Sequence, residues 1–341
     1  MPQALRAGLI KLAKYGLPLG ISALLLWWVF KDQDLAVIAK GFREAEYSWI
    51  VLSVLISILT NYLRAIRWNL LMEPLGYSLS GFRTFLALMV GYFSNIFVPR
   101  LGEITRCGIL YRTDRVPVAQ SFGTVVVERV IDVVSLLIVI GLSLLVEFDK
   151  LYGFVAPYFA DKLQLLKNPL FLTLAGIAAL VLLIGAWLFF KLFKKKLLQY
   201  TLIQKVYALF QQIVEGLLSI KDLKHPILFI LTTIAIWVLY YFMAYVIVFS
   251  LEATSHLSWL AGVSILVMGA IGMAAPVQGG IGAYHILVSS VLVLYGVAKE
   301  DGLVYATLIH SSQALTLLVL GAISFFISLI IENKNTKTAT S

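Results

Sequence analysis

Charged residues stand inside stretches that are otherwise apolar, and their types and spacing are the first guide to chemistry. The first group is Arg100, Glu103 and Arg106, which follow Asn95 and Pro99. If a helix starts just before Glu103, then Glu103 and Arg106 lie three residues apart on one face. Paired guanidinium groups suit phosphate because each presents forked donors, and a helix N-terminus adds amide donors. The group indicates either a phosphate site or a hairpin held shut by an internal arginine–glutamate pair.

A second group, Glu128, Arg129 and Asp132, interrupts the apolar run from 119 to 146. Glu128 and Asp132 are four residues apart and share a helical face, while Arg129 can pair with Asp132 at a spacing of three. The trio could relay protons or balance the arginines of the first group. It could equally form a buried structural ion-pair network, since buried pairs resist removal without acting on a substrate.

A third group surrounds a glycine-rich turn. Such a turn lets a ligand approach the backbone, and a helix that follows it presents free amides to an anion. His285 is either a proton-linked switch or a hydrogen-bonded core residue. The group consists of Gln278, Gly279, Gly280, Gly282, Tyr284 and His285, with His310 and Gln313 on the last apolar run.

Composition places these groups in a membrane. Of the 341 residues, 60% are hydrophobic and only 13% charged, and the mean hydropathy is +0.93, which excludes an ordinary soluble enzyme. The net charge of +9 does not indicate nucleic acid, because the positive charges lie at the ends of apolar segments. Cys107 is the single cysteine, so no disulfide framework is expected. Motifs for ATP binding, for a serine nucleophile and for zinc hydrolysis are absent, so we expect no cofactor or metal.

The charge-free runs predict an all-α polytopic membrane protein with about six full transmembrane spans and two re-entrant hairpins. A span needs about 20 apolar residues. The hairpins, at about 84–115 and 257–297, contain Pro99 and Pro276 beside glycines, and such broken backbone survives at membrane depth only inside protein or beside a watery cavity. Simple hydropathy gives about eight spans instead. The predicted full spans are 15–30, 47–63, 119–146, 168–190, 225–251 and 302–331.

The order span, hairpin, span occurs twice, in halves at about 47–146 and 225–331. Pro99 and Pro276 are 177 residues apart, and the two halves start on opposite sides, which predicts an inverted repeat with a transport site near the midplane. The alternative is a coincidence of proline and glycine positions. We expect one transmembrane domain over 1–331 and a disordered tail over 332–341. The segment 191–224, with seven lysines, is expected to be an amphipathic cytoplasmic linker, either on the membrane surface or packed under the protein.

The distribution of basic residues predicts the orientation. With this threading, nineteen lysines and arginines lie on one side and seven on the other. The positive-inside rule therefore places both termini on the cytoplasmic side of the cytoplasmic (inner) membrane. Arg64 and Arg67 follow a predicted span and are most simply anchors at its cytoplasmic end. The alternative is that they line the entrance to a site.

Four segments together resemble the flippase-like family named for the lysylphosphatidylglycerol synthase transmembrane region. They are 64–68, 95–106, 127–132 and 276–282. The resemblance implies movement of lipids across the cytoplasmic membrane, with aminoacylated phosphatidylglycerol as the best-known cargo. The sequence departs from the bifunctional members because no soluble aminoacyl-transferase domain follows the last span, so we do not expect synthesis of the lysyl lipid. It also has Tyr284 and His285 where the family pattern has an acidic residue.

The expected function is therefore translocation of an anionic lipid, either a phospholipid or a polyprenyl-phosphate carrier. Arg100, Arg106 and Arg129 would hold the phosphate, and the turn at 279–282 would supply amides from the opposite side. Glu103, Glu128 and Asp132 would keep the site near neutrality. One alternative is an integral-membrane transferase that uses Glu103 or Glu128 as a base on a lipid-linked substrate. The other is a noncatalytic subunit that partners a lipid-modifying enzyme.

Overall fold

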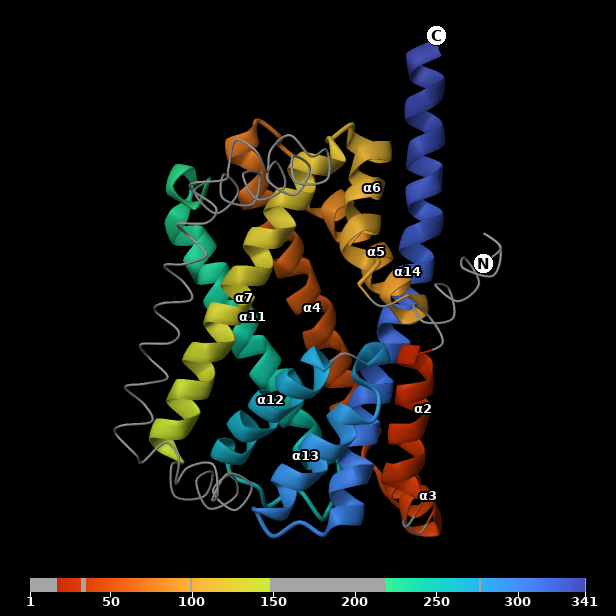
Figure 1. Cartoon of the computed structure of the whole chain (residues 1–341), viewed down its shortest axis with the longest axis vertical. Helices are drawn as coiled ribbons and strands as arrows, with labels where there is room; N and C mark the ends of the chain where they lie inside the picture. Colours follow the sequence, from red (N-terminus) through yellow and green to blue (C-terminus); the bar gives the residue numbers. More distant parts are fainter. Residues whose placement is uncertain (1–16, 32–34, 99, 148–218, 276, 341) are drawn as a thin grey trace, which may run out of the picture.

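The computed structural model describes residues 17–31, 35–98, 100–147, 219–275 and 277–340, and this part of the chain is helical without strands (Figure 1). The all-α prediction is confirmed. The first half contains α2 (Leu17–Phe30), α3 (Leu35–Glu44), α4 (Tyr47–Met72), α5 (Gly81–Phe97), α6 (Gly102–Asp114) and α7 (Val118–Val146). The second half contains α11 (Pro226–Tyr245), α12 (Trp259–Ala274), α13 (Ala283–Val293) and α14 (Lys299–Thr340). Short 3-10 turns are η2 (Glu73–Leu75), η3 (Ser219–Asp222), η4 (Val246–Ser250) and η5 (Gln278–Gly280).

Within the described residues, four helices are long and apolar enough to cross a membrane, so the protein is a multi-pass membrane protein. They are Tyr47–Leu75, Val118–Val146, Pro226–Ser250 and Lys299–Asn333, and they match four of the six predicted spans. The predicted span at 15–30 corresponds to α2, whose 14 residues measure about 21 Å against a hydrocarbon core of about 30 Å. The predicted span 168–190 and the linker up to residue 218 lie outside the described residues. The total number of spans therefore stays a prediction.

The helix ends gather at two levels, as the threading predicts. Figure 1 places the loops at 73–80 and 115–117 and the C-terminal end of α14 at one end of the molecule, and the loops at 251–258 and 294–298 at the other. The tail was predicted to be disordered from residue 332, whereas α14 continues to Thr340. Extension of an existing helix adds one hydrogen bond per residue without a new nucleus, which favours this continuation.

Both predicted hairpins are packed helix pairs. In the first, α5 and α6 approach closely at Gly91 and Gly102, and Arg83 Nη1 lies 2.7 Å from Asp114 Oδ1 where the pair opens. In the second, Gly272 of α12 lies against the backbone of α13. At 13 residues and 11 residues, α6 and α13 are about 20 and 16 Å long, too short to cross the hydrocarbon core. Re-entry into a membrane remains a prediction, and Pro99 and Pro276 lie outside the described residues.

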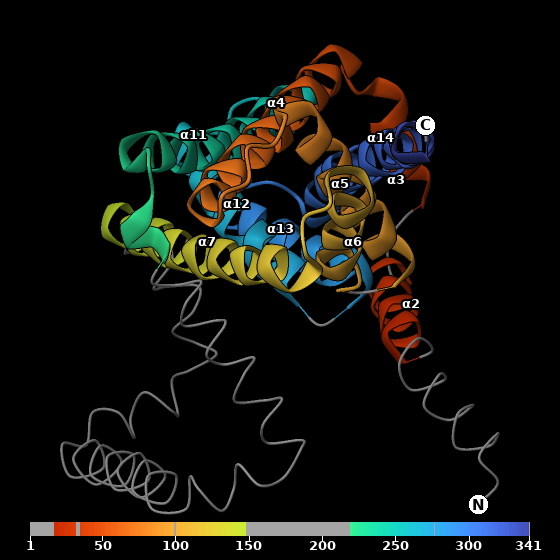
Figure 2. The same ribbon diagram turned by 90° about the horizontal axis from the view of Figure 1, so that it is seen from above.

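The two hairpins meet at their turns. The side-chain Nε2 of Gln278, in η5, donates a hydrogen bond to the carbonyl oxygen of Ile96 near the end of α5. Seen along the long axis, α4 and α11 lie side by side, and α12 lies between them and α7 (Figure 2). Each half also packs on the hairpin of the other, because α14 contacts α5 and α7 contacts α12. The halves are therefore interlocked around the place where the turns meet.

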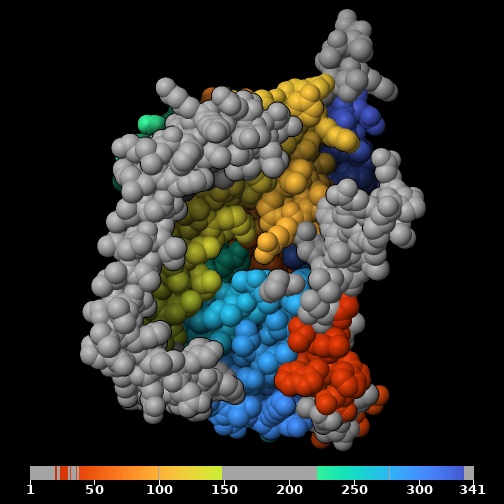
Figure 3. Space-filling model, viewed as in Figure 1, coloured from red at the N-terminus to blue at the C-terminus, as the bar shows by residue number. Residues whose placement is uncertain are grey.

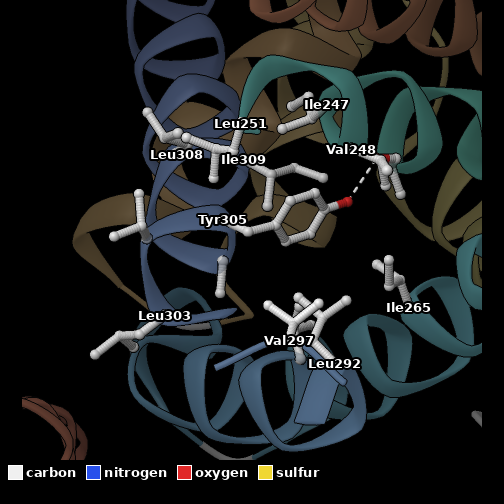
Figure 4. Packing of buried hydrophobic residues seen from close by; sticks show 14 of the residues in the cluster. Ile247, Val248, Leu251, Ile265, Leu292, Val297, Leu303, Tyr305, Leu308 and Ile309 are labelled. Atoms are coloured by element: carbon white, nitrogen blue, oxygen red, sulfur yellow. Dashed lines mark hydrogen bonds between the residues drawn. The ribbon is translucent and has the colours of Figure 1, made fainter. Parts of the chain in front are cut away.

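Buried apolar residues gather in separate cores, the larger of which joins the two halves because it includes Val29, Ile38 and Ile50. One core lies where α4, α5, α6 and α7 meet, around Trp68, Met72 and Leu110. The larger one surrounds Tyr305 of α14 and includes residues of η4, α12 and α13 (Figure 4). The hydroxyl of Tyr305 donates to the carbonyl oxygen of Ala244 at 2.5 Å, so its one polar atom is satisfied inside that core.

The close approach of α5 and α6 predicts a selective effect of adding a methyl group. A Cβ at residue 102 would collide with the carbonyl oxygen of Gly91 and with Asn95, whereas a Cβ at Gly108 on the same helix meets nothing within 4 Å. We expect Gly102→Ala to destabilise the protein by about 1–3 kcal/mol through overpacking. Gly108→Ala should be neutral or stabilising by up to about 1 kcal/mol. Thermal unfolding of both variants in detergent measures this, and equal melting temperatures would contradict the packing.

Candidate functional site

Six charged residues from three helices form one cluster, which we call the arginine–carboxylate cluster. Its members are Arg64 and Arg67 of α4, Arg106 of α6, and Glu128, Arg129 and Asp132 of α7. Arg67 and Glu128 have no exposed surface, and Arg106 and Arg64 are 3% and 7% exposed. Since an isolated buried charge costs on the order of several kcal/mol, the cluster persists only because its members pair with one another.

Glu128 lies at the centre of the cluster. Its Oε2 accepts from Arg106 Nη1 at 2.9 Å, and its Oε1 accepts from Arg64 Nη2 at 2.8 Å and from Arg129 Nη2 at 3.1 Å. Arg67 Nη2 lies 3.4 Å from the same Oε1. One carboxylate therefore contacts four guanidinium groups and connects α4, α6 and α7.

Asp132, one helical turn beyond Glu128, completes the ion pairing. Its Oδ1 accepts from Arg67 Nη2 at 2.6 Å, and its Oδ2 lies 3.6 Å from Arg64 Nη2 and 3.5 Å from Arg129 Nη2. The pairing of Arg129 with Asp132 at a spacing of three was predicted from the sequence, and the structure confirms it. Arg129 and Asp132 are also the most exposed side chains of the cluster, at 43% and 23%.

Aromatic side chains enclose the guanidinium groups. Arg106 lies over the ring of Trp68 at 4.4 Å, and Arg64 lies over Tyr92 at 5.4 Å, distances at which the ring faces attract a cation. Tyr240 of α11 accepts a hydrogen bond from Arg64 Nη1 at 2.9 Å. The second half of the chain thus contributes to the cluster through α11.

The cluster carries more positive charge than it neutralises. Four arginines face two carboxylates, which leaves an excess of two positive charges in a cluster of which only Arg129 and Asp132 are partly exposed. Several buried nitrogen atoms also have no hydrogen-bond acceptor in the described part of the chain. They are Nε of Arg64, Nε and Nη1 of Arg67, Nε and Nη2 of Arg106, and Nε of Arg129. Unpaired buried donors are costly, so this arrangement is suited to an anionic ligand.

A small cavity of ≈ 10 Å³ borders the cluster, between α5, α6 and α7. Glu103 lines it together with Tyr92, Arg106 and Arg129. Buried Oε2 of Glu103 and the Tyr92 hydroxyl have no hydrogen-bond partner among the described residues. The volume matches a single water molecule. The amide of Gly102 donates to Asn95 Oδ1 at 2.6 Å, so this donor at the start of α6 is already used.

The structure changes two interpretations made from the sequence, one for Arg64 and Arg67 and the other for Arg100. Arg64 and Arg67 were interpreted as anchors at the end of a span, and that is wrong: α4 continues to Met72 and both side chains are buried. Their partners lie more than 60 residues away in sequence, where spacing rules do not reach. Asn61, Arg64 and Trp68 recur on one face of α4 and are all buried, and this polar stripe was the available indication. When the buried Arg64, Arg67 and Arg106 are left out of the count, sixteen lysines and arginines still lie on the predicted cytoplasmic side and seven on the opposite side.

Arg100 does not join the cluster. It is exposed and adopts a left-handed backbone conformation with φ 64° in the turn between α5 and α6. Such a conformation is uncommon for a residue with a side chain and reflects the tight connection. The structure therefore separates Arg100 from the arginines with which it was predicted to hold phosphate.

The glycine-rich turn forms a second, separate group. Gly279, Gly280 and Gly282 all have positive φ, at 56°, 74° and 83°, which explains the glycines. The amides of Gly280 and Ile281 donate within the turn, so only part of the predicted amide array is available to a ligand. His310 Nε2 contacts the carbonyl oxygen of Gly279 at 2.9 Å.

Aromatic rings of α13 and α14 cover this turn. Tyr284 stacks on His310 with ring centroids 5.2 Å apart, and His285 meets His310 edge-on at 5.0 Å. His285 is 4% exposed. Gln313 instead donates to Ser53 Oγ at 3.3 Å, away from the turn. In the described residues no group of three or more His, Cys, Asp or Glu could hold a metal ion.

A helical multi-pass architecture with a cationic cluster buried between its helices defines the class of polytopic helical membrane proteins. The chain belongs to the family described as the lysylphosphatidylglycerol synthase TM region, whose model matches residues 16–321. A UPF0104 membrane protein of Methanocaldococcus jannaschii is 31% identical over 126 residues, which cover 36% of this chain and 38% of that relative. The match therefore spans well under half the length of the curated relative. No solved structure matches the chain significantly.

The central place of Glu128 predicts a large loss of stability when its charge is removed. Glu128→Gln leaves four arginines, three of them buried, facing Asp132 alone, so we expect a destabilisation of about 3–5 kcal/mol, as for other broken buried pairs. Glu103→Gln is the matched control, because the buried Glu103 oxygen makes no hydrogen bond in the described part of the chain. Thermal unfolding in detergent compares the two variants. A Glu128→Gln protein as stable as Glu103→Gln would contradict the proposed role of Glu128.

Proposed function

We propose that this protein translocates an anionic lipid across the cytoplasmic membrane, with the phosphate of the lipid held in the arginine–carboxylate cluster. The observation that carries the proposal is the excess of buried positive charge, four arginines against two carboxylates, together with guanidinium N–H groups that lack acceptors. Membership of a family named for a lipid synthase supports a role connected with lipids. A phosphate supplies both the negative charge and the oxygen acceptors that the cluster lacks.

The charge excess is compatible with both kinds of lipid that the sequence suggested. A phosphodiester carries one negative charge, and a phosphate monoester carries about 1.5 to 2 at neutral pH. The cluster has two positive charges in excess, and the carboxylate of Glu103 faces the adjoining cavity. A phospholipid or a polyprenyl phosphate would therefore bring the site near neutrality.

The small volume of the cavity implies that the site must widen to receive its ligand. A space of ≈ 10 Å³ cannot hold a phosphate, so the α5–α6 hairpin or the arginine side chains must move. The contact between Gln278 and Ile96 joins the two hairpin turns and is the natural place for such a change. The helix α14 packs on α5 of the first hairpin, and α7 packs on α12 of the second hairpin. This reciprocal packing supports an inverted repeat with re-entrant hairpins, in which rocking of the halves alternates access to the site.

The orientation follows from the remaining basic residues. The end of the molecule with loops 73–80 and 115–117 would face the cytoplasm, because the division of sixteen to seven satisfies the positive-inside rule. The cluster lies on the same half of α4 as this end, since Arg64 and Arg67 precede the end of α4 by less than three turns. The lipid would then bind from the cytoplasmic leaflet, where anionic lipids are enriched.

Transport also accounts for the cluster better than a transferase does. Both oxygens of Glu128 accept hydrogen bonds from arginines, and a carboxylate held in this way is a poor general base. We therefore propose that the protein is a transporter and not an enzyme that uses Glu128 as its base; a transferase would have to use Glu103, whose buried Oε2 lines the cavity without a hydrogen-bond partner among the described residues. Mass analysis of the lipids after incubation checks this point, because a transferase would leave a chemically altered lipid.

Arg106 provides the direct test. In a liposome scrambling assay with a fluorescent anionic phospholipid or polyprenyl phosphate, we expect Arg106→Gln to lose about tenfold to a hundredfold in rate, because a charge-assisted hydrogen bond is worth about 1.5–3 kcal/mol. Arg112→Gln is the matched control on α6, since Arg112 is 59% exposed and lies 3.7 Å from Glu332. Size-exclusion chromatography verifies folding. Equal rates for folded wild type and Arg106→Gln would rule out the cluster as the phosphate site.

A further inference from the structure

A groove of ≈ 550 Å³ lies between α7, α11 and α12, next to the arginine–carboxylate cluster. Figure 3 shows a hollow bounded by α7 (yellow-green) and α12 (cyan), with the α5–α6 hairpin (gold) beyond it. Its walls are almost entirely apolar, with Ile138, Leu142 and Val146 on α7, Ile234 on α11, and Leu260 and Val263 on α12. Pockets of about 300–1,000 Å³ hold small organic ligands.

The groove continues directly from the cluster. On α7 its first lining residue, Ser135, comes one turn after Asp132, and its last is Glu147, a distance of about 18 Å along the helix. On α11, Tyr240 accepts the hydrogen bond from Arg64, while the next residue, Tyr241, lines the groove. A charged end and an apolar channel therefore share two helices.

The groove occupies a place where the two halves differ. The last helix of the second half, α14, packs directly against α4, the first predicted span of the first repeat half. The counterparts of these helices are α7 and α11, and in the described part of the chain they make no comparable backbone packing. The helices that wall the groove are these same two, so the space is a consequence of their separation.

Two polar atoms in the groove lack partners. The indole N–H of Trp237 and the hydroxyl of Ser143 are buried without a hydrogen-bond partner among the described residues, although both residues line the groove. The ring of Trp237 also packs edge-on against Tyr240 at 5.9 Å, which places this donor beside the cluster. A ligand that brings an oxygen acceptor between a phosphate and a hydrocarbon chain would satisfy it.

We propose that this groove seats one hydrocarbon chain of the anionic lipid whose phosphate occupies the cluster, an inference that rests on the proposed function. The length of about 18 Å matches the depth of one leaflet, which is half of a hydrocarbon core of about 30 Å. A non-helical polypeptide is a poorer occupant, because its amides would find no row of acceptors in these apolar walls. The groove thus selects a lipid by its chain while the cluster selects it by its phosphate.

The test uses phosphatidylglycerol with a photoreactive diazirine in one acyl chain, reconstituted in liposomes with the full-length protein. Leu142→Trp fills the groove, and Leu145→Trp is the control, because Leu145 is exposed on the same helix, as Leu142 is, but does not line the groove. We expect labelling of the groove walls on α7, α11 and α12 to fall about tenfold in Leu142→Trp, equivalent to about 1.4 kcal/mol, and to persist in Leu145→Trp. Phosphatidylcholine with the same chain should label the groove weakly in all three proteins.

The outcomes separate this inference from the proposed function. Equal groove labelling in the two tryptophan variants, or equal labelling by phosphatidylcholine and phosphatidylglycerol, would overturn the chain seat. So would labelling absent from the groove in wild type. If Arg106→Gln abolishes scrambling in the same preparations, the proposed function still stands. Conversely, groove labelling that depends on a net negative headgroup and on an open groove, without any scrambling by wild type, would support the chain seat and reject translocation.

Discussion

The architecture depends on the contact of one buried carboxylate, Glu128, with four arginines. Each arginine alone would be too costly to bury between apolar helices, and Glu128 makes their burial possible by contributing both of its oxygen atoms to different guanidinium groups. Because Arg64, Arg106 and Glu128 come from α4, α6 and α7, the same contact fixes the first hairpin against two spans. Asp132 adds a second carboxylate but does not balance the total. The remaining positive charge is the feature on which the proposed phosphate site rests.

The sequence predicts the parts of this site that depend on local order. Glu128, Arg129 and Asp132 are visible because they interrupt an apolar run at helical spacing, and the pairing at a spacing of three is what the structure contains. The hairpin from α5 to α6 was predicted because proline and glycine break a helix there. The contribution of Arg64 and Arg67 depends instead on contacts across more than 60 residues, which no periodicity reports. Arg100 stays outside the cluster because it is exposed in a turn with a left-handed backbone conformation, which residue spacing does not report.

The two halves share an architecture but not a chemistry. The first hairpin borders arginines and carboxylates, whereas the second presents a glycine turn covered by Tyr284, His285 and His310. The glycines there serve the backbone, because three positive φ angles within four residues exclude most side chains. The hairpins nevertheless meet through Gln278 and Ile96. This contact joins the two turns without any second charged site.

The asymmetry between the halves also explains how one protein can accommodate an amphipathic ligand. An ion that crosses about 30 Å of hydrocarbon needs compensating charge within the protein, whereas a lipid chain needs none, because its surroundings are already apolar. The arginine–carboxylate cluster meets the first requirement between α4, α6 and α7. The separation of α7 from α11 meets the second by leaving an apolar groove one turn further along α7. If α7 packed on α11 as α14 packs on α4, the charged cluster would remain, but the hydrocarbon chain of a lipid would have no groove beside it.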